Sequence, residues 1–100
     1  MAEVHLTLIG WKNKRQLITD MTLFAEDAGH RVVSRLALPP DAAGTRLELA
    51  PGTYHLYALF TSLPYIYCAD AAPLAVPAQL GLTLDLDKAT IDDVVGPPPA

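Results

Sequence analysis

Three histidines and one cysteine are the side chains whose types could bind a metal or act as a base or nucleophile. His5, His30 and His55 are widely separated along the chain, so a zinc site would require the fold to bring them together. A cupredoxin-type copper site needs a histidine soon after its cysteine, and none follows Cys68. The spacing therefore favours three separate surface histidines over a metal centre.

Nucleophilic catalysis by a thiol or a hydroxyl needs a histidine base held beside it. Neither Ser34 nor Ser62 lies in a Gly-x-Ser-x-Gly turn, which would place a serine for this chemistry. Cys68 lies in the run Tyr-Ile-Tyr-Cys-Ala, where it is typical of a small hydrophobic strand residue. Because it is the only cysteine, no disulfide can form within the chain, which is compatible with a reducing compartment.

Charged residues are few, and their distribution argues against nucleic acid as a partner. The formal net charge is −4, whereas a nucleic-acid-binding domain needs a basic face. The basic cluster over residues 12–15, Lys-Asn-Lys-Arg, predicts a solvated loop. The spacing of the late acidic residues matches no calcium loop and predicts a solvated edge. These residues are Asp85, Asp87, Asp92 and Asp93.

The composition raises self-association as an open alternative. Hydrophobic residues make up 51% of the chain and charged residues only 18%, which is low for a small monomer with a polar surface. The excess apolar area is covered either by a second chain or within a thick core. No secretory signal is predicted, and the apolar stretches are too short to insert in a membrane, so we expect a cytoplasmic location if Met1 is the native start.

The stretch that organises the chain is residues 50–61, APGTYHLYALFT, in which apolar side chains recur at every second position after a Pro-Gly turn. Tyr54 begins the face that points into the core, and the opposite face carries His55, Tyr57 and Leu59. The short alternating run over 45–49 predicts a hairpin with this strand. Further strands are expected over residues 3–11, 16–25, 31–38, 65–69 and 80–87, which makes about seven in all.

Turn signals separate these strands and end the domain. Gly29, in the loop Glu-Asp-Ala-Gly, suits a left-handed position, and residues 90–93 could cap one helical turn or form a loop. We expect a single domain over residues 1–95, followed by a Pro-rich flexible tail or linker over 96–100. Short strands with frequent turns predict an all-β antiparallel sandwich of about seven strands.

Two segments resemble a known family. One is Thr22–Gly29, TLFAEDAG, a strand with an acidic glycine loop, and the other is Leu49–Tyr54, LAPGTY, followed by the alternating strand. Together they resemble the transthyretin-like (prealbumin-like) sandwich group, which includes carboxypeptidase regulatory-like domains and collagen-adhesin B-type repeats. The resemblance covers residues 17–87. It implies a transthyretin-like or immunoglobulin-like sandwich with the side chain of Tyr54 in the core, and fold alone does not determine function.

The resemblance also implies two chemistries that these residues do not favour. Transthyretin-like hydrolases of hydroxyisourate have an opening-strand histidine, matched by His5, and a mid-chain arginine, matched at best by Arg46. Their C-terminal Tyr-Arg-Gly-Ser is absent, because this chain ends in Pro-Pro-Pro-Ala. Isopeptide cross-linking in collagen-adhesin repeats requires a core lysine, but Lys12 and Lys14 lie in the polar loop and Lys88 lies at a strand end.

Aromatic residues provide the remaining candidate site. His55, Tyr57 and Leu59 form an outer stripe on the central strand, and with Trp11 they are the candidate partner-binding residues. We therefore expect a non-catalytic module, without cofactor or metal, that binds a protein partner or a second copy of itself. The alternative is a carbohydrate-binding module that stacks sugars on exposed aromatic rings, and a small hydrolase is the third and least favoured interpretation.

Overall fold

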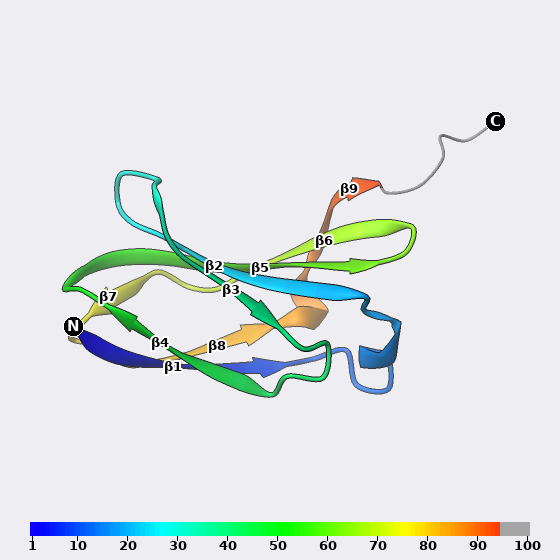
Figure 1. The fold of residues 1–100 in the computed structure, drawn as a ribbon, viewed down its shortest axis with the longest axis horizontal. Helices are drawn as coiled ribbons and strands as arrows, with labels where there is room; N and C mark the ends of the chain where they lie inside the picture. Colours follow the sequence, from blue (N-terminus) through cyan, green and yellow to red (C-terminus); the bar gives the residue numbers. More distant parts are fainter. Residues whose placement is uncertain (95–100) are drawn as a thin grey trace.

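The computed structural model describes residues 1–94, and this part of the chain is all-β, as predicted (Figure 1). Nine strands and two single 3-10 turns are present there, instead of about seven strands. The expected tail over 96–100 lies outside the described residues. No helix within residues 1–94 has the length and apolar character needed to span a bilayer. In chain order the elements are β1 (Ala2–Ile9), η1 (Arg15–Leu17), β2 (Asp20–Glu26), β3 (Val32–Leu38), β4 (Gly44–Leu49), β5 (Gly52–Ser62), β6 (Tyr65–Asp70), β7 (Leu74–Val76), β8 (Gly81–Asp85), η2 (Leu86–Lys88) and β9 (Thr90–Val94).

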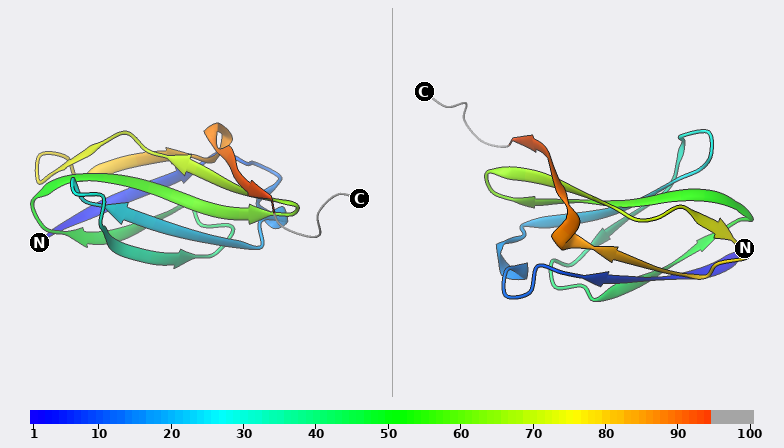
Figure 2. Two further views of the ribbon diagram at one scale, coloured as in Figure 1. Left: turned by 90° about the horizontal axis from the view of Figure 1, so that it is seen from above. Right: turned by 180° about the vertical axis from the view of Figure 1, so that it is seen from behind.

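The strands form two sheets that face each other (Figures 1 and 2). The smaller sheet has the order β4-β1-β8, and the larger has the order β3-β2-β5-β6-β9, with β7 paired to the start of β5. All neighbours are antiparallel except β1 and β8, which run parallel. Strand β5 therefore contacts three other strands and lies at the centre of the larger sheet.

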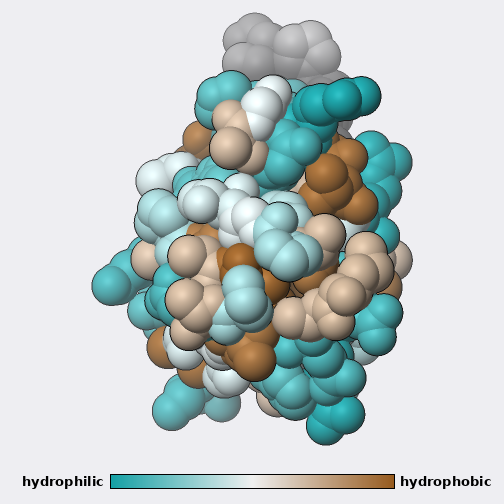
Figure 3. Space-filling view, turned by 90° about the vertical axis from the view of Figure 1, so that its left-hand side faces the viewer, coloured by the Kyte–Doolittle hydropathy of each residue, from teal (hydrophilic) through white to brown (hydrophobic). Residues whose placement is uncertain are grey.

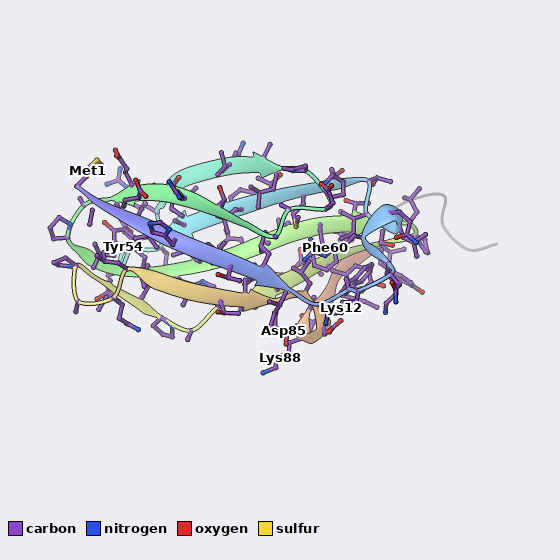
Figure 4. The ribbon with its side chains drawn as sticks, turned by 90° about the horizontal axis from the view of Figure 1, so that it is seen from below. Met1, Lys12, Tyr54, Phe60, Asp85 and Lys88 are labelled. Carbon is purple, nitrogen blue, oxygen red and sulfur yellow. The ribbon has the colours of Figure 1, made fainter. Side chains whose placement is uncertain are left out.

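Because side chains alternate between the two faces of each strand, one face of each sheet is buried in the core. On β1, the side chains of Val4, Leu6 and Leu8 are 0%, 2% and 4% exposed, whereas the residues between them face solvent. On β5 the predicted inward face is likewise buried, and Tyr54 and Phe60 lie toward opposite ends of the interior (Figure 4). Each fully buried leucine contributes roughly 2 kcal/mol to folding, so this shared layer holds the two sheets together.

The Pro-Gly segment joins the two sheets, so the predicted hairpin between β4 and β5 is wrong. Strand β4 pairs with β1, whereas β5 pairs with β2, β6 and β7. Leu49 and Tyr54, on either side of the corner, bury their side chains in one core from opposite sheets. The hydroxyl of Tyr54 donates a 2.6 Å hydrogen bond to the carbonyl oxygen of Ala50, which closes the corner.

Several local predictions are wrong, and in two of them backbone pairing or local hydrogen bonds override residue preference. Residues 90–93 belong to strand β9, because β6 offers them an open edge for pairing. The left-handed residue in the β2–β3 loop is His30, with φ of 63°, and not Gly29. There the carboxylate of Asp27 accepts hydrogen bonds from the backbone amides of Gly29 and Arg31. The strand expected over 16–25 begins only at Asp20, after the turn η1.

The basic cluster is only partly a solvated loop. Lys12 and Lys14 are exposed as expected, but the side chain of Arg15 is half-buried. Its guanidinium donates hydrogen bonds to the carbonyl oxygens of Gly10, Pro40 and Ala42, at 2.7 to 3.1 Å. Arg15 therefore ties the loop after β1 to the loop between β3 and β4.

Candidate interaction surface

The outer face of the larger sheet, which points away from the core, carries the predicted stripe. On β5, the side chain of His55 is exposed and those of Tyr57 and Leu59 are half-buried, alternating with buried neighbours. The structure therefore brings these three side chains together on one face. That they bind a partner stays a prediction.

Strand register builds a row of four side chains across this face. Arg35 on β3 lies opposite Phe24 on β2, Phe24 lies opposite Tyr57 on β5, and Tyr57 lies opposite Asp70 on β6. The guanidinium of Arg35 lies over the Phe24 ring, 5.3 Å from its centre. The Phe24 and Tyr57 rings stack with centroids 5.2 Å apart and planes 14° apart. The row thus runs from a cation, through two stacked rings, to a carboxylate.

Polar side chains lie next to Tyr57, the central tyrosine of this row. His55 lies opposite Glu26 in the next row, and its Nε2 lies 2.8 Å from Oδ1 of Asp70. The rings of His55 and Tyr57 are 5.2 Å apart. Burial raises the pKa of the Tyr57 hydroxyl, and the neighbouring Glu26 carboxylate raises it further. The hydroxyl therefore stays protonated and able to donate a hydrogen bond near neutral pH.

Cys68 lies on the same face, opposite Leu59 on β5. Burial raises the pKa of its thiol to about 11, and the carboxylates of Asp70 and Asp92 add to this rise. Since the thiolate is the nucleophile, a thiol with so high a pKa reacts slowly near neutral pH. Cys68 adds a half-buried, uncharged side chain to this face near neutral pH.

Trp11 is not part of this face. It follows β1 in a left-handed conformation, with φ of 55°, and its half-buried ring packs edge-on against Phe60 and Tyr67. The centroid distances are 5.0 and 5.2 Å, so Trp11 covers one end of the core. The structure thus separates Trp11 from the other three predicted residues, and the ring that lies beside Tyr57 is that of Phe24.

Phe24 and Arg35 are the residues that sequence reasoning missed. The signal for Phe24 was present, because apolar side chains fall on both faces of the run over 16–25. Such a run indicates a strand whose second face is also covered, but the sequence does not say which strand lies beside it. Only the register of β2 against β3 and β5 places these two side chains next to Tyr57.

The three histidines lie in separate places. His5, His30 and His55 contact different carboxylates, those of Glu3, Glu26 and Asp70, at 3.0, 3.7 and 2.8 Å. Within residues 1–94, no three His, Cys, Asp or Glu side chains are grouped as a metal site requires.

The residues matched to the hydrolase family lie on the outer face of the smaller sheet. His5 and Arg46 are opposite each other in the β1–β4 register, and both contact the carboxylate of Glu3. All three are exposed, and no pocket is found over residues 1–94. Figure 3 shows the end of the molecule where β4 turns into β5, and there apolar patches lie between polar ones. The pair is adjacent, but nothing encloses a substrate there.

No protein-family model, no curated protein and no solved structure matches this chain.

Proposed function

We propose that this chain is a non-catalytic interaction module, a transthyretin-like sandwich that binds protein through the outer face of its larger sheet. The observation that carries the proposal is the stacked pair Phe24 and Tyr57, held at the surface on two central strands. Arg35 lies beside Phe24 on β3, and Leu59 lies next to Tyr57 along β5. Aromatic residues and arginine are enriched at protein interfaces, because their large, stiff side chains bury much area at low entropic cost.

The Pro-Gly corner supports the transthyretin-like assignment. In that family the tyrosine of the Leu-x-Pro-Gly-x-Tyr corner lies in the core. Here Tyr54 is 7% exposed and donates its hydroxyl hydrogen to the carbonyl of Ala50. Two facing, mainly antiparallel sheets are consistent with the same family.

The carbohydrate-binding alternative is less well supported. It relied on a stacking platform of Trp11, Tyr57, Tyr65 and Tyr67, but the ring of Trp11 packs against Phe60 and Tyr67. On the outer face, Phe24 and Tyr57 stack on each other, and a guanidinium already covers Phe24. A glycan that binds the wild-type chain but not the variant Tyr57→Ala would favour this alternative.

Site-specific photo-crosslinking in the host cell tests the proposal. A photoreactive amino acid replaces Leu59 on the outer face, and a matched chain carries it at Thr7 on the outer face of the smaller sheet. We expect a discrete protein adduct, identified by mass spectrometry, from position 59 and not from position 7. Equal labelling from both positions, or no protein adduct from position 59, would contradict the proposal.

A further inference from the structure

On the outer face of the larger sheet, side chains of opposite charge lie at matching positions on the two sides of a line drawn between β2 and β5. On one side of that line lies the cation Arg35, and at the same distance on the other side lies the carboxylate of Asp70. With strands about 4.8 Å apart, each is about 7 Å from the line. In the next row, Glu26 lies on the β2 side and His55 on the β5 side. The left view of Figure 2 looks down on this face, with β3, β2, β5 and β6 side by side.

We propose that this face binds the same face of a second copy of the chain, about a two-fold axis parallel to the strands and between β2 and β5. This inference rests on the proposed function and names the partner. The axis exchanges β2 with β5 and β3 with β6. Arg35 then meets Asp70 of the second copy, Phe24 meets its Tyr57, and Glu26 meets its His55. Each contact occurs twice, as an isologous interface requires.

The other two-fold arrangement opposes like charges. An axis that crosses the strands would lay β3 over β3 and β6 over β6. Arg35 would then approach Arg35 of the second copy, and Asp70 would approach its Asp70. Like charges held together across an interface weaken it and select against the arrangement. The order of charges across the sheet therefore favours the axis that runs along the strands.

The size of the face sets the expected strength of this dimer. Four strands about 4.8 Å apart and about seven residues long give a footprint of roughly 450 Å² per copy. A standard stable interface buries about 800 Å² per partner, so we expect a weak dimer with micromolar affinity. The natural twist of facing sheets rotates them by about 30°, which keeps the contacts closest near the axis.

Two charge-reversal variants test the axis directly. Arg35 and the Asp70 side chain are exposed, so Arg35→Glu and Asp70→Arg leave the core untouched. In a dimer of either variant alone, two pairs of like charges face each other, at positions 35 and 70 of the two copies. We therefore expect its dissociation constant to be about tenfold higher than that of the wild-type dimer. In an equimolar mixture, the introduced carboxylate of one copy faces the introduced guanidinium of the other, and native Arg35 faces native Asp70. We expect the mixture to regain affinity to within about threefold of wild type.

Sedimentation velocity over a concentration series measures these constants, with far-UV circular dichroism to verify folding. Arg46→Glu and Asp41→Arg, at exposed positions outside the larger sheet, make the same charge changes as controls and should leave the wild-type dissociation constant unchanged. A mixture that stays as weakly associated as its components, or a wild-type chain that is monomeric at high micromolar concentration, would overturn the proposal. If position 59 crosslinks only to a different protein, the proposed function stands and this inference fails.

Discussion

The hydroxyl of Tyr54 donates a 2.6 Å hydrogen bond to the carbonyl oxygen of Ala50, across the corner where the chain leaves one sheet and enters the other. The tyrosine ring is buried beneath this corner, with 7% of its surface exposed. One side chain therefore fixes both the path of the backbone and the packing at this end of the core. The link stabilises the two-layer arrangement that turns the stripe on β5 outward.

Tyr54→Phe should lower the free energy of unfolding by about 1 kcal/mol, because it removes one partly buried hydrogen bond and keeps the ring. Tyr54→Ala should cost about 3–5 kcal/mol, because it also empties the ring's place in the core. Urea unfolding followed by circular dichroism measures both. Tyr65→Phe, at a half-buried tyrosine on β6, serves as the control and should change stability by less than about 0.5 kcal/mol.

Arg15→Ala should destabilise the fold by about 1–2 kcal/mol, although the basic cluster to which Arg15 belongs has the sequence of a solvated loop. The change leaves three backbone carbonyls without the guanidinium that ties two loops together. Lys12→Ala, in the same loop, removes the same charge at an exposed position and should be nearly neutral. Equal thermal midpoints for the two variants would show that Arg15 has no structural role.

Trp11→Ala should reduce stability without affecting the outer face. Loss of the ring removes its edge contacts with Phe60 and Tyr67, and for this half-buried residue we expect a cost of about 2 kcal/mol. The substitution lies apart from the Phe24–Tyr57 row, so the dissociation constant of the dimer should change by less than about twofold. A much larger loss of association in a folded Trp11→Ala chain would place Trp11 in the interface after all.

Alkylation of Cys68 should be slow at neutral pH and accelerate strongly in alkali. The thiol pKa is raised from 9.0 to about 11 by burial and by nearby carboxylates, so at pH 7.5 iodoacetamide should react about a hundredfold more slowly with the folded chain than with the urea-unfolded chain. Asp70→Asn removes one of these carboxylates and should increase the rate. An unchanged rate in Asp70→Asn would contradict the assigned cause.

The same raised pKa gives a defined pH dependence of stability. The unfolded thiol loses its proton at a lower pH than the folded one, so the unfolded state binds fewer protons between about pH 9 and 11. Stability should therefore fall as pH rises through this window. Cys68→Ala should remove part of that fall, and chemical unfolding at pH 8 and pH 10.5 measures the difference.

Some of this architecture was predictable from the sequence, because side-chain burial in a strand has a period of two. The inward faces of β1 and β5 follow from their alternating residues alone. The sheet that each strand joins was not predictable, because β1 pairs with β8, which lies more than seventy positions later in the chain. The segment Ala50–Gly52 has the residues of a hairpin turn, and only these distant pairings make it a corner between sheets.

The candidate surface was also predictable from the sequence only in part. Alternation on one strand placed His55, Tyr57 and Leu59 on a common face, as the structure has them. The position of Trp11 was not predictable, because large aromatic residues occur both at interfaces and in cores, and it depends on the turn that follows β1. That Trp11 binds a partner stays a prediction. Phe24 became part of the surface only through strand register, which local sequence does not encode.

The central claim is that the outer face of the larger sheet binds a second copy of the chain, and a dilution series of amide NMR spectra tests it most directly. Between low micromolar and millimolar concentration, we predict shifts confined to β2, β3, β5 and β6, largest near Phe24 and Tyr57. The amides of β1 and β4 should stay unchanged. Spectra that do not vary with concentration, or shifts centred on the smaller sheet, would contradict the claim.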